Sequence, residues 1–184
     1  MPFTSNSTYG TVNYSTGTLF DNSKILANDG SSLSSATLAT QSDLSIPIGG
    51  YERVMGIYTL WYDTDTTNEL SYAIKNLDNE SSPSVIATTI ATHSLASVVY
   101  TDAAVTPSAA GVECVTSYST DGAGEVIGVD SGVSDAAALF LQVNFNALST
   151  AATKGHIVLQ LANITGTAAG THLLAGSNVV WKKW

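Results

Sequence analysis

Residues 45–76 read SIPIGGYERVMGIYTLWYDTDTTNELSYAIKN, and this stretch decides the fold. Successive side chains of an extended strand point to opposite faces, so a period of two in the sequence predicts a strand. One face of residues 53–63 carries four apolar side chains, Val54, Tyr58, Leu60 and Tyr62. The opposite face carries three more, Met55, Ile57 and Trp61. A strand that is apolar on both faces is covered twice, so we expect one face in the domain core and the other against a second surface.

The rest of this stretch predicts a compact group of strands. A first short strand centres on Pro47, which favours an edge position or a strand start because proline cannot donate a ladder hydrogen bond. A Gly-Gly turn at residues 49–50 leads into the long strand. The polar segment 63–68 is predicted as a hairpin tip that joins the long strand to an alternating strand at residues 70–76. That last strand points its apolar side chains one way, Leu70, Tyr72 and Ile74, and its polar ones the other, Ser71 and Lys75.

Strand patterns recur along the remaining chain. They cover residues 44–48, 112–119, 125–129, 138–146, 155–163 and 177–184. Residues 77–110 are predicted mostly as loop, and the stretch 85–100 is left open between a short helix and two short strands. No amphipathic helix longer than about 11 residues is convincing. About eight short strands at this spacing predict an all-β chain, folded as a sandwich or a barrel.

The first 40 residues differ from the rest of the chain. They are rich in Ser, Thr and Asn, and the spacing of their apolar side chains fits neither a helix nor a sustained strand. They also hold too many aromatic and aliphatic residues for a purely disordered tail. We therefore expect an extended N-terminal arm over residues 1–40, which gains order on a neighbouring surface, and one β-sandwich domain over residues 41–184.

Charge and composition argue against several classes of protein. Only 11% of the 184 residues are charged, and six Lys and Arg against 15 Asp and Glu leave a net charge of −9. Six scattered cations cannot build a stripe that follows a phosphate backbone, so no nucleic-acid partner is expected. No apolar run approaches the roughly 20 residues that span a bilayer, and the N-terminus does not resemble a secretory signal. We expect a soluble protein, made in a host cytoplasm, without a membrane partner.

Motifs for catalysis and for metal or cofactor binding are missing from the sequence. It contains no nucleophile elbow, P-loop, dinucleotide fingerprint, H-E-x-x-H or C-x-x-C. The single cysteine, Cys114, lies in an alternating run and is expected to be a buried small hydrophobe. His93, His156 and His172 are far apart in the sequence, and the acidic segment after Asp63 lacks the glycine and distal Glu of an EF-hand. We expect no enzyme and no catalytic, cofactor-binding or metal-binding residues.

Two parts of the chain together suggest a family. The first part combines IPIGGYE (46–52), MGIYTLWYD (55–63), Thr66-Thr67 and LSYAI (70–74), and the second combines GHIVLQLAN (155–163), LAGS (174–177) and Trp181. In this order the chain resembles a group of small structural proteins of tailed, cyanophage-like bacteriophages and related marine or freshwater phages. That group is often placed among capsid decoration (cement) proteins or other small virion proteins. The resemblance runs from about residue 36 to residue 184, and residues 77–110 take no part in it.

The resemblance implies a jelly-roll-like antiparallel β-sandwich that forms a homotrimer on the outside of a phage head. Such a protein clamps neighbouring subunits of the major capsid protein, so the implied partners are further copies of the chain and that capsid protein. The implied location is the capsid surface of the virion. The side chains expected at the intersubunit or capsid contacts come from the arm, the second face of the long strand and the C-terminus: Phe3, Tyr9, Tyr14, Phe20, Met55, Ile57, Trp61 and Trp184.

Two other classes of function stay open at this point. The first is a phage tail fibre or head-fibre component that binds a host receptor, which would occur in tens of copies per virion or fewer. The second is a carbohydrate-binding or jelly-roll enzyme domain, which would need grouped exposed aromatics, a carboxylate pair or a histidine cluster.

Overall fold

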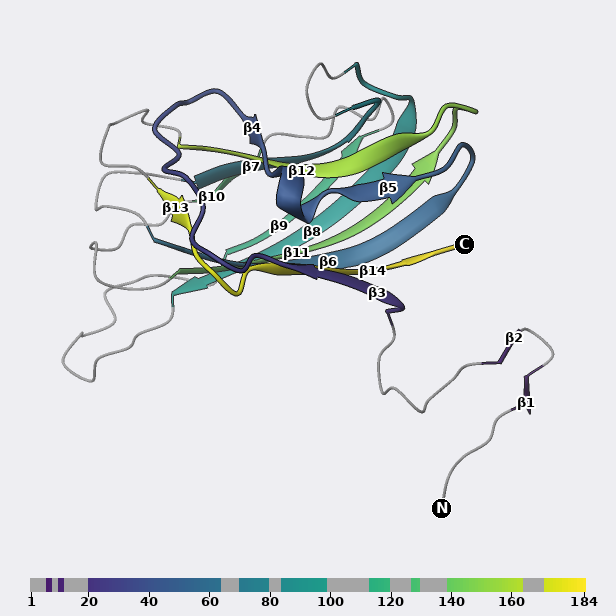
Figure 1. Cartoon of the computed structure of the whole chain (residues 1–184), viewed down its shortest axis with the longest axis horizontal. Helices are drawn as coiled ribbons and strands as arrows, with labels where there is room; N and C mark the ends of the chain where they lie inside the picture. Colours follow the sequence, from purple (N-terminus) through teal and green to yellow (C-terminus); the bar gives the residue numbers. More distant parts are fainter. Residues whose placement is uncertain are drawn as a thin grey trace.

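The computed structural model describes residues 6–7, 10–11, 20–63, 70–79, 84–98, 113–119, 127–129, 139–163 and 171–184. The strands are β1 (Asn6–Ser7), β2 (Gly10–Thr11), β3 (Asn22–Ile25), β4 (Ala39–Thr40), β5 (Ile46–Ile48), β6 (Arg53–Asp63), β7 (Leu70–Leu77), β8 (Thr88–Val98), β9 (Glu113–Ser119), β10 (Ile127–Val129), β11 (Leu139–Ser149), β12 (Gly155–Asn163), β13 (His172–Leu173) and β14 (Asn178–Lys183). A 3-10 turn, η2 (Ser42–Leu44), precedes β5. The described ranges contain no α-helix, and the predicted all-β chain is confirmed (Figure 1). Within residues 85–100, which the sequence leaves open between helix and strand, residues 88–98 form one long strand, β8.

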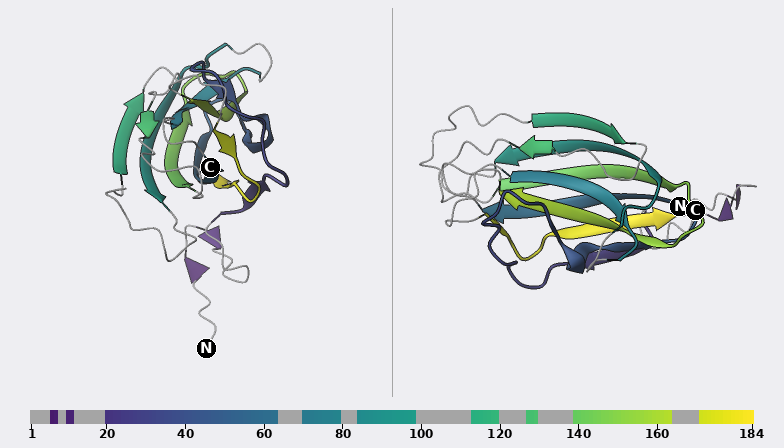
Figure 2. Two further views of the ribbon diagram at one scale, coloured as in Figure 1. Left: turned by 90° about the vertical axis from the view of Figure 1, so that its left-hand side faces the viewer. Right: turned by 90° about the horizontal axis from the view of Figure 1, so that it is seen from above.

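Two antiparallel sheets are stacked face to face (Figures 1 and 2). One sheet has the order β10-β7-β12-β4, and β5 pairs with the same edge of β12 as β4 does. The other has the order β3-β14-β6-β11-β8-β9, with β13 beside β6. This arrangement confirms the predicted antiparallel β-sandwich, while jelly-roll connectivity stays a prediction. A separate pair, β1 and β2, is also antiparallel.

The core lies between the inner faces of the two sheets. The predicted inner face of β6 is confirmed, since Val54, Tyr58, Leu60 and Tyr62 are all at most 2% exposed. The facing sheet contributes a matching set of buried side chains: Ile46, Ile48, Leu70, Tyr72, Ile74, Ile157, Leu159 and Leu161. These residues form a single continuous hydrophobic cluster, which is the unit of stability of the sandwich.

The predicted hairpin between residues 53–63 and 70–76 is wrong. β6 pairs with β11, β13 and β14, whereas β7 pairs with β10 and β12 in the opposite sheet. The edges of β6 are already paired, with β11 on one side and with β13 and β14 on the other. The apolar inner face of β7 therefore meets that of β6 across the core, from the opposite sheet. Of the strand pairs that are consecutive in sequence, β8 and β9 do form an antiparallel ladder.

The strands buried on both faces are β7 and β12 rather than β6. The outward-facing Ser71 and Ala73 of β7 are 4% and 0% exposed, and Val158 and Ala162 of the adjacent β12 are equally covered. The alternation of residues 70–76 predicts that Ser71 lies on a polar, outward face, and on that face it is nevertheless buried. By contrast the outer face of β6 keeps Met55 38% exposed. The second covering expected for β6 is therefore incomplete in the single chain.

The expected division of the chain at residue 40 differs from the structure. β3 pairs with β14, β4 pairs with β12, and Leu26 and Leu33 pack against the core. Backbone hydrogen bonds tie the connecting segment to the same region, from Gly30 to Leu173 at 2.8 Å and from Leu33 to Thr171 at 2.7 Å. Residues 22–40 thus belong to the sandwich, because ladder pairing and apolar burial hold them there. Residues 1–19 lie outside the described ranges apart from β1 and β2.

Candidate interaction surface

The outer face of the seven-stranded sheet carries an apolar row centred on β6. The strand register places Ile57 beside Val180 of β14 and Trp61 beside Phe140 of β11. The Trp61 and Phe140 rings meet edge to face, with centroids 5.2 Å apart and planes at 62°. These four side chains are half-buried, and Met55 at the end of the row is exposed. We call Met55, Ile57, Trp61, Phe140 and Val180 the β6 outer row.

Uncharged polar side chains border the β6 outer row on the β11 side, while Lys182 of β14 lies opposite Met55 on the other side. Gln142, Asn144 and Asn146 point outward from β11, opposite Thr59, Ile57 and Met55 respectively. The Asn144 amide donates to the carbonyl of His93 on β8 at 3.5 Å. Partly covered apolar side chains beside amides, with few charges between them, are typical of the central part of a protein–protein contact. The outer face therefore has the composition of an interface rather than of a catalytic cleft.

A second candidate surface lies at the tip of the sandwich, in the turn that joins β5 to β6. Tyr51 has a positive φ of 57° and a side chain that is 69% exposed. The turn is closed by hydrogen bonds from the Gly49 amide to the Glu52 carboxylate at 2.6 Å and from the Tyr51 amide to the Ala151 carbonyl at 3.0 Å. Gly50 lies directly against the Ala152 carbonyl, so only a residue without Cβ fits there. The fold thus holds a bulky aromatic residue in a backbone region that favours glycine.

The strain at Tyr51 gives a stability prediction. Glycine adopts a positive φ freely, whereas any residue with a Cβ is disfavoured there by roughly 1 kcal/mol. We expect Tyr51→Gly to be more stable than Tyr51→Ala by about 1 kcal/mol, although both variants lose the same ring. Urea unfolding of the two variants measures this difference. If the two variants unfold with equal urea midpoints and equal slopes, the turn relaxes and Tyr51 is not strained.

Trp184 and Arg53 lie beside each other at the same tip. The amide of each donates to the carbonyl of the other, at 3.0 Å from Trp184 and 3.3 Å from Arg53, so the β6–β14 ladder continues one pair beyond Lys183. Arg53 is exposed and Trp184 is 57% exposed. Figure 1 places the C-terminus and the β5–β6 turn at the same end of the sandwich. We call Tyr51, Arg53 and Trp184 the tip.

The other predicted contact residues are only partly accounted for. Phe20 is half-buried at the start of the described sandwich. Phe3, Tyr9 and Tyr14 lie outside the described residues, as does the side chain of Cys114, whose backbone is part of β9. Of the predicted set, the structure brings Met55, Ile57 and Trp61 together on one face and places Trp184 at the tip.

Four surface residues were missed by the sequence reasoning. Phe140 and Val180 alternate with inward residues of their strands, so the period of two could have added them to the β6 outer row. Arg53 could have been found in the same way, because it occupies the outward phase of β6. Tyr51 carries no such signal, since its exposure follows from a backbone conformation that the sequence does not reveal.

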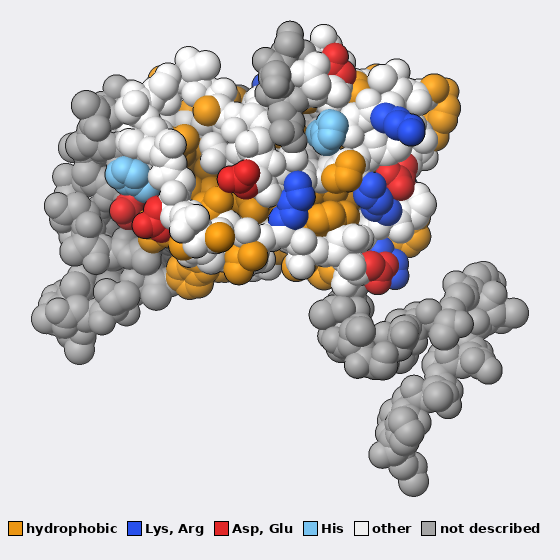
Figure 3. All heavy atoms as spheres, in the orientation of Figure 1, with side chains coloured by type: hydrophobic (Ala, Val, Ile, Leu, Met, Phe, Trp, Pro, Cys, Tyr) orange, Lys and Arg blue, Asp and Glu red, His pale blue; other side chains and the backbone are white. Residues whose placement is uncertain are grey.

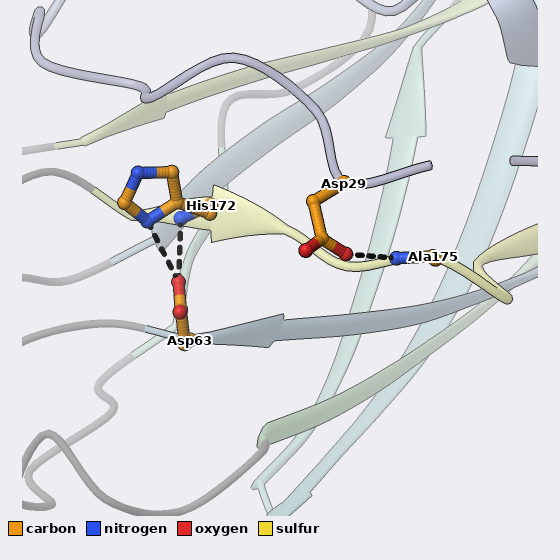
Figure 4. A network of polar contacts seen from close by, with 4 residues as sticks. All are labelled: Asp29, Asp63, His172 and Ala175. Carbon is orange, nitrogen blue, oxygen red and sulfur yellow. Dashed lines mark hydrogen bonds and ion pairs between the residues drawn. The ribbon is translucent and has the colours of Figure 1, made fainter. Parts of the chain in front are cut away.

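Among the described residues, the histidines and carboxylates do not gather into one cluster. His172 Nδ1 and the Asp63 Oδ1 atom are 3.0 Å apart, and the same oxygen accepts a hydrogen bond from the His172 amide at 3.0 Å (Figure 4). Asp29 accepts one from the Ala175 amide at 2.8 Å. The Asp63 carboxylate thus joins β13 to β6, and the Asp29 carboxylate joins the segment after β13 to the loop after β3.

The other two histidines, His93 and His156, lie on β8 and β12, in different sheets. In the described part of the chain no three His, Cys, Asp or Glu side chains could hold a metal ion.

One hollow of about 300 Å³ lies between the loop after β3 and the η2 turn. Its lining includes Leu26, Leu33, Leu44 and Leu173, and among the lining residues Asp43 is the single ionisable one. Ligand sites usually combine an apolar pocket with several converging polar groups or residues of perturbed pKa. This hollow offers one carboxylate, so the two surfaces described above are the stronger candidates.

No helix in the described ranges is long and apolar enough to cross a membrane. Comparison with known proteins gives no identification, because no family model matches the chain and no curated protein matches it.

Proposed function

We propose that this protein is a non-enzymatic structural protein of a phage virion, a decoration protein that forms a homotrimer and clamps neighbouring major capsid subunits on the outside of the head. The observation that carries the proposal is the half-buried β6 outer row, whose Met55 is 38% exposed, on the outer face of a sandwich with one continuous core. The resemblance of residues 46–74 and 155–181 to small phage structural proteins supports the viral setting.

Self-association through the β6 outer row would complete the covering of β6. Burial of apolar surface contributes about 25 cal/mol per Å², and the row offers two aromatic and three aliphatic side chains on one rigid sheet. A contact between unlike surfaces closes into a ring when the rotation per copy is one third of a turn. Repeated copies on a capsid lattice make modest binding per copy effective, which suits a small clamp.

Trp61→Asp tests the self-association. A carboxylate in the centre of a buried contact loses its hydration without gaining a partner, which costs several kcal/mol. We expect the native mass to fall from three times the 19.0 kDa chain to that of one chain. Size-exclusion chromatography with light scattering measures this change.

Val85→Asp is the matched control for this test. Val85 is 46% exposed and lies on the connection from β7 to β8, bridged to Leu77 of the other sheet. It should keep the mass of the wild-type protein. An unchanged mass for Trp61→Asp, in a folded variant, would rule out the β6 outer row as the intersubunit surface.

The place of the protein on the particle is tested with heads of the phage that encodes it. Heads lacking this protein should take up the purified chain until hundreds of copies are bound, measured by co-sedimentation and quantitative gel analysis. Saturation at tens of copies or fewer would favour the fibre alternative, and no uptake would contradict the decoration function.

A further inference from the structure

The tip presents three exposed side chains of the types that dominate binding energies. Tyr, Trp and Arg are the residues most enriched among those that cost the most affinity when truncated. Tyr51 and Trp184 are 69% and 57% exposed, although both have large apolar rings. Arg53 is two residues after Tyr51 in the chain and lies directly across the ladder from Trp184.

The backbone at the tip is rigid, which favours a role in recognition. The turn that carries Tyr51 is fixed by bonds to Ala151 and within the turn itself, between Gly49 and Glu52. A strained residue is retained where the surrounding structure over-determines it, and such residues cluster at ligand contacts. Holding the ring in advance also lowers the entropy lost on binding.

The charges around the tip differ from those of the chain as a whole. The chain has a net charge of −9, yet four of its six basic residues lie at or near this end: Arg53, Lys154, Lys182 and Lys183. Lys183 pairs with Glu52 at 3.4 Å and Lys182 with Asp21 at 3.7 Å, while no ion pair among the described residues involves Arg53. Figure 3 shows most of the visible Lys and Arg side chains towards the end where β14 terminates.

We propose that the tip is the surface that docks on the capsid, and that its partner is an acidic protein surface with an apolar hollow beside its carboxylates. The two rings would fill the hollow while the Arg53 guanidinium, with five donors in a fixed planar fork, pairs with a carboxylate. This inference rests on the proposed decoration function. It adds which end of the molecule faces the head and what chemistry the head supplies.

The threefold symmetry of the proposed trimer supports the tip as the docking surface. In a closed ring every copy has the same orientation relative to the rotation axis, so a trimer formed through the β6 outer row presents all three tips at the same height. Three tips that bind together raise the overall affinity well above that of one. A negatively charged body would also turn the less acidic tip towards an acidic target during approach.

A protein surface fits the tip better than a nucleic acid does. Binding to a phosphate backbone needs many cations along a track, whereas two of the four basic residues here are already neutralised by Glu52 and Asp21. One guanidinium at the same end of the sandwich as two exposed rings matches a localised carboxylate.

The test uses the full-length chain and heads that lack it, with affinity measured by co-sedimentation. Tyr51→Gly, Arg53→Glu and Trp184→Ser should each weaken binding by about 10-fold to 30-fold. Tyr51→Gly is expected to relieve backbone strain, and urea unfolding of this variant shows whether a loss of binding occurs in a folded protein. The wild-type affinity should fall as salt is raised, and that dependence should be weaker in Arg53→Glu.

Two control variants separate the tip from general surface effects. Ile25→Ser removes an apolar side chain that is 69% exposed, like Tyr51, from the edge strand β3. Lys24→Glu changes the net charge by the same amount as Arg53→Glu. Both controls should bind within about 2-fold of the wild type.

The outcomes distinguish this inference from the proposed function. If the wild type binds heads and the three tip variants bind equally well, the decoration function stands and the tip is not the docking surface. If the wild type does not bind heads, both proposals fall. If Arg53→Glu abolishes binding to a single-stranded oligonucleotide while head binding is unchanged, the tip serves a nucleic acid and this inference is wrong.

Discussion

Gly56→Ala is expected to destabilise the sandwich by about 3 kcal/mol, at the upper end of what overpacking a core costs. Gly56 lies in the middle of β6 and is buried. A Cβ at this position would lie 2.5 Å from the Val180 carbonyl oxygen and 2.8 Å from the Phe145 ring. The ring could rotate, but the carbonyl belongs to the backbone of β14, which pairs with β6 on both sides of this point. Relief therefore requires β14 to separate from β6.

Guanidinium unfolding of Gly56→Ala and Gly49→Ala measures this effect against a matched control. A Cβ on Gly49 would meet the Glu52 carboxylate at 3.4 Å and nothing closer, so Gly49→Ala is expected to stay within about 1 kcal/mol of the wild type. Equal stability of the two variants would contradict the close packing of β14 on β6. Because β14 also carries Val180, a loosened ladder should weaken self-association in the same variant.

The alternation of side chains predicts one part of the architecture, namely which residues of each strand face the core. The predicted inward phase of β6 is confirmed, and the same alternation buries Leu141, Val143 and Phe145 of β11 and Val179 and Trp181 of β14. These assignments need only local information, because a period of two decides the face of each residue. Pro47 was likewise placed correctly at an edge, since β5 pairs with β12 alone among the described strands.

The choice of strand partners could not be predicted from the same information. β6 and β7 are neighbours in the sequence and have compatible alternation, which is also the pattern of a hairpin. Whether such strands pair or face each other depends on the whole set of ladders, and here β11 and β14 occupy both edges of β6. The double burial of β7 is similarly non-local, because Ser71 and Ala73 are small and carry no strong signal for either face.

The same contrast applies to the candidate surfaces: alternation in the sequence predicts one of them, and tertiary contacts decide the other. Met55, Ile57 and Trp61 were recognised because they form an apolar phase opposite a second apolar phase. Of the three tip residues, only Trp184 was predicted as a contact residue. The contribution of Tyr51 depends on a positive φ and on a bond to Ala151, a residue 100 positions away in the chain. Tertiary contacts of this kind decide the exposure of turn residues, and a single sequence does not contain them.

Tyr58→Ala is expected to cost about 3–5 kcal/mol, the range for removing a large aromatic side chain from a core. Tyr58 is fully buried on β6, and its ring contacts that of Phe145 with a centroid distance of 5.3 Å. Its hydroxyl donates to the Leu44 carbonyl of η2 at 3.3 Å, so one side chain links the seven-stranded sheet to the turn that precedes β5. Its loss would leave a cavity and an unpaired carbonyl together. Denaturant unfolding measures the cost, and a loss below about 1 kcal/mol would contradict the packing.

Tyr58→Phe keeps the ring and separates the hydroxyl from the cavity. We expect a cost of about 1 kcal/mol near neutral pH, the usual net value of one buried hydrogen bond. Burial raises the pKa of the Tyr58 phenol far above its ordinary value. The unfolded chain therefore releases this proton above about pH 10 while the folded chain retains it, and the contribution of Tyr58 to stability falls as the pH rises. Tyr58→Phe has no phenol and therefore lacks this loss. Above pH 10 its free energy of unfolding should rise relative to that of the wild type by about 1.4 kcal/mol per pH unit. A stability difference that is independent of pH between 8 and about 11.5 would show that the phenol ionises as freely in the folded protein as in the unfolded chain.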